Sequence, residues 1–388
     1  MSAATGAARY DSALAEVLDA AAAHAEHADE TAEFPTAALD AMRATGLLGL
    51  LVPAEHGGGG GGLGDLVDVT LRLARVDMSV ALIFAMHCQQ VVAVVRHADG
   101  PLAERLLPAL GKGDLYLASV TTERGKGGHL LSSESTVRQD AGTLTIDRDA
   151  PIVTGGQHAD AYLITTLAPD ATSPSQVSLV YARRDQLTLE VRGGWQPLGM
   201  RATQSVPMRL TGRVPADQVI GAPGKFREIV APTFGPLAHI GWSAAWLGAA
   251  TGALSRILHH IRDAGRGQFD PSSELLLTRL ARVRGRLDLV NALLRHTVAA
   301  VDAAPDVADP STQLLVNSLK VHAAEQCFAA ADEMVELVGL RHGYLRSSPL
   351  YLERVFRDLR SASLNYANDR LLLVNGALTL RDRQVHLA

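Results

Sequence analysis

Cysteine is nearly absent from this sequence, which has two in 388 residues, Cys88 and Cys327. No CxxC pair and no Cys/His cluster with zinc-site spacing occurs, so we expect neither a disulfide framework nor a structural metal. Basic residues are not in excess either: 36 lysines and arginines face 41 acidic residues, and the net charge is −5. This balance disfavours a nucleic-acid binder, which needs a basic face to neutralise phosphates.

A long uninterrupted hydrophobic run is also lacking. The longest apolar stretch, Val80 to Val95, is interrupted by His87, Gln89 and Gln90. We therefore expect a buried core helix there rather than a membrane span. The first ten residues show no basic segment followed by an apolar one, so no signal peptide is expected. These features predict a cytoplasmic protein without a membrane partner.

Glycine is concentrated in one place, the run Gly57 to Gly62. Six consecutive glycines neither hold a helix nor pack a strand, so a flexible loop is predicted. A glycine-rich loop can bind phosphate when a strand precedes it and a GK[ST] helix follows it. That context is missing here, which disfavours a phosphate-binding function for the run.

The periodicity of apolar residues divides the chain into three parts. Residues 1–114 show helical spacing, and residues 115–222 show short β-rich runs separated by turn residues. Residues 223–388 contain four long helical segments, at about 235–262, 272–302, 311–338 and 350–377. The predicted fold is α+β: an N-terminal helical domain, a middle β-domain and a C-terminal four-helix bundle. The β-runs are expected at residues 115–121, 143–147, 161–167, 177–182, 187–191 and 206–210.

A series of short motifs then narrows the fold. The motifs are Gly46–Gly58 (GLLGLLVPAEHGG), Leu107–Gly113 (LPALGKG), Val120–Gly128 (VTTERGKGG), Thr154–Asp160 (TGGQHAD), Leu198–Ser205 (LGMRATQS) and Arg357–Arg360 (RDLR). Each motif is weak alone, but their order and spacing together resemble the acyl-CoA dehydrogenase family of flavoproteins over nearly the whole chain. The resemblance implies the family's fold and a flavin cofactor.

The resemblance also implies which residues hold the flavin. Thr122 and neighbouring amides are expected at the pyrimidine ring, and Thr154 is expected to face flavin N5. Ile152 replaces the family's stacking tryptophan, Gly128 replaces a serine, and the motifs for the adenine half are eroded. FAD is expected, with FMN as the alternative. The implied positions are Val120, Thr121, Thr122, Gly127, Gly128, Ile152, Val153, Thr154, Arg266, Phe269, Glu336, Gly339 and Asn368.

The catalytic glutamate of the family is missing from both of its usual places. The resemblance assigns these places to Tyr366 and Ala238. Tyrosine, with an unperturbed pKa of about 10, is a poor base for removing an α-proton. Tyr366, His239 and His87 are the candidate catalytic residues, although each histidine also fits a structural role in a helical core. Glu123 is expected to be a structural acid.

Three functions follow from these departures. The first is an FAD-dependent oxidation of an acyl thioester, on coenzyme A or a carrier protein, with an unusual base or outcome. The second is a two-component flavin monooxygenase that uses reduced flavin and oxygen, for which no α-proton abstraction is needed. The third is a non-catalytic subunit partner. A homodimer or homotetramer is expected, with an electron-transfer protein or a flavin reductase as a further partner.

Overall fold

The computed structural model describes residues 7–125, 129–263, 269–381 and 384–387. The chain divides into two compact units, each of which is built from separate stretches of sequence. The first unit contains Met1–Leu66, Ile83–Gln196 and Ala202–Ala238, so it holds both the N-terminal helices and the strands. The second contains Val67–Leu82, Pro197–Arg201 and His239–Ala388. The three consecutive domains 1–114, 115–222 and 223–388 stay a prediction.

The N-terminal part of the chain is helical, as its apolar spacing predicts. The helix α2 (Thr36–Ala44) follows Pro35, and Gly46, with a φ of 70°, turns the chain after it. The long apolar run forms α4 (Met78–His97), whose first turn is capped by the Asp77 carboxylate. This helix is long and apolar enough to cross a membrane, yet 89% of its most apolar window is buried inside the protein. The remaining N-terminal helices are α1 (Asp11–Thr31), α3 (Leu63–Val76) and α5 (Gly100–Gly111).

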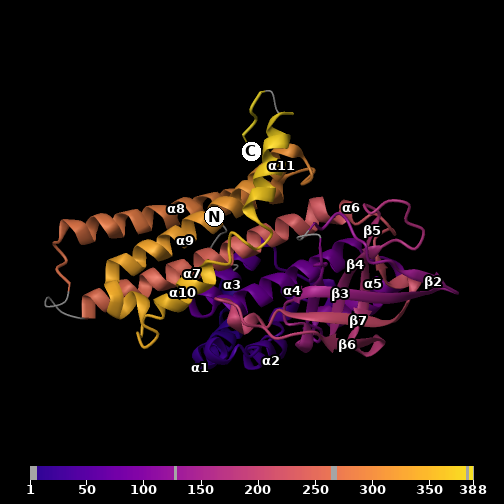
Figure 1. Cartoon of the computed structure of the whole chain (residues 1–388), viewed down its shortest axis with the longest axis horizontal. Coiled ribbons are helices and arrows are strands. Elements are labelled where there is room, and N and C mark those ends of the chain that lie inside the picture. The colour runs from indigo at the N-terminus through magenta and orange to yellow at the C-terminus, as the bar shows by residue number, and fades with distance from the viewer. Residues whose placement is uncertain (1–6, 126–128, 264–268, 382–383, 388) are drawn as a thin grey trace. The chain divides into compact units, whose positions relative to one another are not determined.

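The strands form two four-stranded sheets in the first unit. One sheet has the order β1-β4-β5-β8 and contains a parallel β1–β4 pair, and the other is antiparallel with the order β2-β3-β7-β6. Figure 1 shows β3, β7 and β6 side by side. The six predicted β-runs are confirmed, and β2 and β8 are additional. The strands are β1 (Leu117–Val120), β2 (Arg138–Asp140), β3 (Thr143–Val153), β4 (Ala161–Leu167), β5 (Val177–Arg183), β6 (Leu187–Val191), β7 (Val206–Pro215) and β8 (Val219–Ile220).

The core of the first unit joins its helices to one sheet. Apolar side chains from α4, α5, β1, β4 and β5 pack together with the short helix α6 (Arg227–Ile229). Burial of such side chains away from water is the main force that holds the two kinds of element together. Representative members are Val91, Val94, Leu106, Leu110, Leu117, Leu163, Leu179, Tyr181, Phe226 and Phe234.

The second unit is a helical bundle that departs from the prediction in one element. Its long helices are α7 (Gly235–Asp263), α8 (Glu274–Ala303) and α9 (Pro310–Gly339), and Figure 1 shows α8 and α9 side by side. The prediction of one continuous helix over residues 350–377 is wrong. The structure has α10 (Leu352–Leu359) and α11 (Asn368–Thr379), separated by turns. Tyr366 has a φ of 47°, a left-handed conformation that a continuous helix excludes.

The glycine run is a hydrogen-bonded turn rather than a flexible loop. The amides of Gly59 and Gly61 donate to the carbonyls of Gly49 and Leu50. A Cβ on Gly58 would lie 2.3 Å from the Val52 carbonyl oxygen, so this position requires glycine. The run is therefore held by close backbone packing, and its amides are used within the turn instead of being presented to a phosphate.

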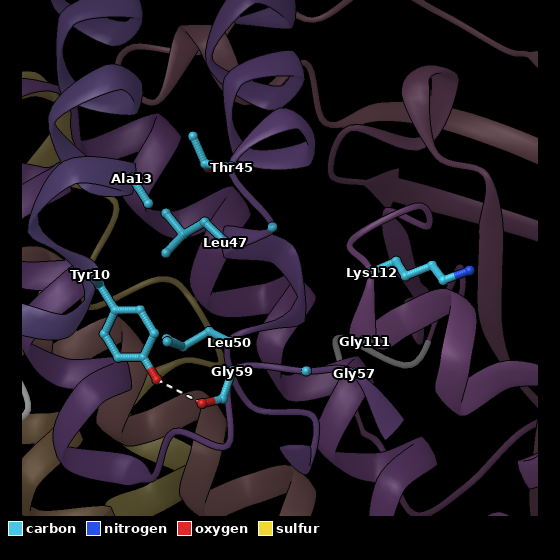
Figure 2. A pocket seen from close by; sticks show the side chains of 11 residues that line it. Tyr10, Ala13, Thr45, Leu47, Leu50, Gly57, Gly59, Gly111 and Lys112 are labelled. Carbon is cyan, nitrogen blue, oxygen red and sulfur yellow. Dashed lines mark hydrogen bonds between the residues drawn. The ribbon is translucent and has the colours of Figure 1, made fainter. Parts of the chain in front are cut away.

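A pocket of about 270 Å³ lies against this turn. Figure 2 shows the Tyr10 hydroxyl donating to the Gly59 carbonyl, at 3.0 Å, and Lys112 extending away from the tyrosine ring. Among the described residues that line it, none is a carboxylate, histidine or cysteine. We assign no chemistry to this pocket.

Candidate functional site

The expected flavin edge lies in the first unit, where β1 and β3 end. The Thr122 hydroxyl donates to the Ile152 carbonyl at 2.8 Å and accepts from the Ile152 amide at 3.3 Å. A register shift in the pairing of β3 with β7, between Ala150 and Val153, precedes this contact. Irregularities of this kind re-aim side chains at the end of a strand. The segments that contain Thr122 and Ile152, both expected at the flavin, are thus hydrogen-bonded to each other.

A buried ion pair, formed by Arg148 and Glu123, contacts the backbone of this edge at Thr122. Arg148 and Glu123 lie 3.0 Å apart, with side chains that are 2% and 13% exposed. Arg148 also donates to the Thr122 carbonyl at 2.8 Å, and Glu123 accepts from the Ser135 amide at 2.8 Å. Glu123 therefore has the structural role that the sequence predicts for it.

Arg148 itself was missed by sequence reasoning, although a signal for it exists. In β3 the side chains of Leu144, Ile146, Arg148 and Ala150 alternate inward and are buried. Strand alternation places an arginine at an inward position, where a charge requires a partner. The pattern alone could have predicted a buried pair, but not that Glu123 completes it.

The surface chemistry of the edge fits a flavin ring. Ile152 is 46% exposed, whereas the adjacent Val153 and Val120 are buried. The Thr154 hydroxyl is hydrogen-bonded to Ser205 at 2.9 Å, and Ser205 also contacts Thr203. Thr121 and Thr122 are half-buried. An exposed apolar side chain beside a hydroxyl-rich rim offers both surfaces that a planar ring with polar edges needs.

The other residues expected at the cofactor lie away from this edge or outside the described part of the chain. Gly127, Gly128 and Arg266 lie outside the described residues. Phe269 packs edge-on against His260, with ring centroids 5.9 Å apart. Glu336 is exposed and its carbonyl accepts from Arg279, while Gly339 ends α9 with a φ of 69°. These positions stay a prediction.

His87 is engaged on both sides of its ring. Nε2 lies 3.0 Å from the Leu48 carbonyl, and Nδ1 lies 3.0 Å from the Leu117 amide, which donates to it. The ring is therefore neutral with its proton on Nε2, and burial lowers its pKa to about 4. Both nitrogens are used to join three segments of the first unit. This arrangement corresponds to the structural alternative, a satisfied core histidine.

The remaining candidates, Tyr366 and His239, meet in the second unit. Their ring centroids are 6.2 Å apart. Burial lowers the pKa of His239 to about 3 and raises the pKa of Tyr366. Ala238, at the other position of the missing acid, is buried and directly precedes His239. Neither group of the pair is a strong base near neutral pH.

Lys320 is a buried cation beside this pair, and sequence reasoning missed it. Its ammonium donates to the Tyr366 carbonyl at 3.1 Å and to Asn368 Oδ1 at 2.8 Å. Asn368 in turn donates to Glu325, which is exposed, so the asparagine expected at the cofactor has both ends of its amide engaged. Burial lowers the pKa of Lys320 to about 8. The sequence signal that could have indicated this buried cation is a lysine placed among the apolar residues of α9.

Comparisons with known proteins agree with the fold. The family model described as "Acyl-CoA dehydrogenase, N-terminal domain" matches residues 10–114, and the C-terminal domain model matches residues 240–369. Cyclohex-1-ene-1-carbonyl-CoA dehydrogenase of Syntrophus aciditrophicus is 24% identical over 338 residues, covering 86% of this chain and 79% of that protein. The amino sugar nitrososynthase DnmZ of Streptomyces peucetius is 28% identical over 367 residues, covering 90% and 86%.

A solved structure extends the likeness. The dibenzothiophene monooxygenase TdsC of Paenibacillus sp. A11-2, in complex with FMN and indole, superposes with a TM-score of 0.85 at 21% identity. The superposition covers 97% of this chain and 98% of that one. At this identity the likeness shows the fold, and both dehydrogenases and oxygen-using enzymes share it.

Proposed function

We propose that this chain, which belongs to the acyl-CoA dehydrogenase family, is a flavin-dependent monooxygenase rather than a dehydrogenase of acyl thioesters. The observation that carries the proposal is the nature of the two positions where the family's acid is expected. Ala238 has no ionisable group, and Tyr366 has a pKa raised further by burial. Dehydrogenation of a thioester requires a base that removes an α-proton, and oxygenation does not.

The neighbours of Tyr366 do not replace that base. His239 is desolvated, and Lys320 lowers its pKa further by charge repulsion. A group with a pKa of about 3 holds a proton too weakly to remove one from carbon at neutral pH. Glu325 is exposed and hydrogen-bonded to Asn368. The cluster around Tyr366 therefore supplies no base for the removal of an α-proton.

The flavin-edge residues Val120, Thr121, Thr122 and Ile152 would hold the cofactor, with Arg148 and Glu123 fixing the position of Thr122. When bound in reduced form, a flavin supplies the electrons that activate oxygen. We propose FMN as the cofactor, with FAD as the alternative. Its support is the eroded adenine-half motifs and the FMN named for the dibenzothiophene monooxygenase structure.

Reduced flavin would come from a separate flavin reductase in the cytoplasm. Two of the similar proteins, a dibenzothiophene monooxygenase and an amino sugar nitrososynthase, are named for reactions other than the dehydrogenation of a thioester. We also propose a homo-oligomer. Its support is a set of large apolar side chains exposed on the bundle helices, three of them consecutive in α11, because apolar side chains that gather in one exposed patch mark interfaces. They include Leu275, Leu277 and Leu289 of α8 and Leu372, Leu373 and Val374 of α11.

The test uses the purified full chain, supplied with a flavin reductase, NADH and isotopically labelled oxygen. Indole, a thioether and an amino sugar serve as probe substrates, and mass spectrometry measures label in the products. We expect label incorporation that depends on reduced flavin. In a parallel anaerobic experiment, acyl-CoA thioesters of several chain lengths are added to the flavin-loaded protein. Bleaching of the flavin by any of them would establish the dehydrogenase instead.

A further inference from the structure

Three hydroxyl groups form a continuous hydrogen-bonded row beside the end of β3 in the first unit. Ser205 Oγ lies 2.9 Å from Thr154 Oγ1 on one side and 2.9 Å from Thr203 Oγ1 on the other. Thr154, Ser205 and Thr203 are 8%, 4% and 2% exposed, so the row runs inward from Thr154. The backbone fixes its two ends relative to each other, because the Gly155 amide donates to the Thr203 carbonyl at 3.0 Å.

The number of protons in this hydroxyl row restricts how it can be bonded. Each hydroxyl donates once, so Ser205 donates to one of its two neighbours and accepts from the other. In the outward order, Thr203 donates to Ser205, and Ser205 donates to Thr154. In the inward order, Thr154 donates to Ser205, and Ser205 donates to Thr203. The same oxygen positions serve both orders, because the proton of a hydroxyl rotates about its C–O bond.

The order of the row decides what Thr154 offers to a ligand. Among the described residues, Ser205 is the hydrogen-bond partner of the Thr154 hydroxyl, which leaves that hydroxyl able to bond once more. In the outward order Thr154 has a proton to donate, and in the inward order that proton is used and a lone pair accepts. Thr154 follows directly after β3, whose Ile152 is 46% exposed. The hydroxyl row therefore ends at the edge proposed to hold the flavin.

Hydrogen bonding at flavin N5 differs between the two redox states. The oxidised ring has a lone pair at N5 and requires a donor, whereas the reduced ring carries hydrogen at N5 and requires an acceptor. Hydrogen bonds to the ring nitrogens are one of the means by which a protein adjusts the properties of this cofactor. A group that only donates, such as a backbone amide, suits one state. A hydroxyl suits both, provided that its own proton finds an acceptor when it turns inward.

We propose that Ser205 is a positioning residue that lets the Thr154 hydroxyl donate to an oxidised flavin and accept from a reduced one. Thr203 gives or takes the hydrogen bond at the far end as the order of the row reverses. The reversal rotates O–H bonds and breaks none. The inference rests on the proposed function in placing a flavin ring at Thr154. It serves that function because the protein must bind flavin in the reduced state and hold it through oxidation.

The test compares the two redox states of FMN bound to the purified full chain. Quenching of FMN fluorescence gives the affinity for oxidised FMN, and anaerobic titration against a reference dye gives the reduction potential of bound FMN. In Ser205→Ala the Thr154 proton has no inward acceptor. Oxidised FMN should bind nearly as in wild type, and reduced FMN about tenfold more weakly. For a two-electron couple this change corresponds to a potential about 30 mV more negative.

Two serine variants separate this role from a structural one. Ser205→Thr keeps a hydroxyl at the same position and should restore the wild-type potential. Ser178→Ala is the matched control, because it removes another serine hydroxyl, 2% exposed in β5, which accepts from the Gly224 amide at 2.8 Å. It should affect the free energy of unfolding without shifting the potential. A shift in Ser178→Ala equal to that in Ser205→Ala would overturn the proposal.

A Thr154→Val background shows whether Ser205 acts through Thr154. Valine has nearly the same shape but no hydroxyl, so adding Ser205→Ala should leave the potential of this background unchanged. An equal shift with and without the Thr154 hydroxyl would refute the role of Ser205. An unchanged potential in Ser205→Ala alone would refute it as well.

These measurements and the oxygen-labelling test fail independently. If labelled oxygen enters a probe substrate while Ser205→Ala keeps the wild-type potential, the role of Ser205 is wrong and the monooxygenase stands. If the potential shifts as expected and no probe is oxygenated, the role of Ser205 stands and the monooxygenase does not. Failure of the wild-type chain to bind FMN or FAD would overturn both.

Discussion

Replacing Glu123 by glutamine tests the ion pair beneath the proposed flavin edge. Glutamine keeps the shape of the side chain and one acceptor for the Ser135 amide, but it removes the charge 3.0 Å from Arg148. Arg148 is only 2% exposed, so its guanidinium would stay buried without a counter-charge. Breaking a buried pair in this way costs about 3–5 kcal/mol, and the retained hydrogen bond places Glu123→Gln near the lower limit.

The matched control is Asp147→Asn, one residue before Arg148 in β3. Asp147 also pairs with an arginine, Arg209 at 2.8 Å, but these side chains are 56% and 41% exposed. Surface pairs contribute about 0–1 kcal/mol, so this variant should be close to wild type. The free energy of unfolding is measured from urea titrations followed by circular dichroism.

The ion pair should also affect the cofactor, because Arg148 donates to the Thr122 carbonyl at 2.8 Å. We expect Glu123→Gln to weaken flavin binding about tenfold, measured by quenching of flavin fluorescence, while Asp147→Asn leaves it unchanged. Equal stability losses in the two variants would refute the argument from burial. Unchanged flavin affinity in a destabilised Glu123→Gln would show that the pair supports the fold but not the flavin edge.

Three further predictions concern other parts of the chain. Gly58→Ala should lower the free energy of unfolding by about 1–3 kcal/mol, because its Cβ would lie 2.3 Å from the Val52 carbonyl oxygen. In Gly62→Ala, in the same run, the new Cβ would meet nothing within 4 Å, so this variant should not be destabilised. Equal melting temperatures of the two variants would contradict this argument. Burial lowers the pKa of Lys320 from its ordinary value of 10.5 to about 8, so the unfolded state binds more protons between these pH values and stability should rise with pH there. Urea titrations at pH 8 and 10 should show that this part of the rise is lost in Lys320→Met, and an identical pH profile would exclude it. Leu373→Asp, at a side chain that is 76% exposed, should reduce the molar mass measured by light scattering if this leucine lies in an oligomer interface.

Much of the fold could be predicted because its signals are local. The strand β4 (Ala161–Leu167) has the predicted bounds, since its apolar residues are bracketed by turns. The break between α10 and α11 could not be predicted in this way. It depends on the left-handed backbone of Tyr366, whose carbonyl accepts from Lys320, a residue 46 positions away. Long-range contacts of this kind override the helical propensity of a segment.

In the candidate site too, features that depend on local sequence could be predicted, and features that depend on long-range contacts could not. Thr122 and Ile152 could be assigned from motifs, because the motifs preserve the order of residues along the chain. His239, Ser243 and Trp246 could be placed on one face of α7 by counting. That His239 Nδ1, Ser243 Oγ and Trp246 Nε1 have no hydrogen-bond partner among the described residues could not be predicted, because it depends on contacts with segments distant in sequence. Lys320 is recognisable as unusual in the sequence, but its neighbours come from three separate helices and turns.

Lys320 also bears on why the missing acid would not be restored by one substitution. In Tyr366→Glu, the new carboxylate would belong to the residue whose carbonyl accepts from the Lys320 ammonium. A nearby cation stabilises the ionised carboxylate and lowers its pKa, whereas α-proton removal is helped by a pKa raised toward neutrality. We therefore expect Tyr366→Glu alone to leave bound flavin unbleached by acyl-CoA under anaerobic conditions. The double variant with Lys320→Met is the one that should gain bleaching. Bleaching by the single variant would show that Lys320 does not control the electrostatics of this position.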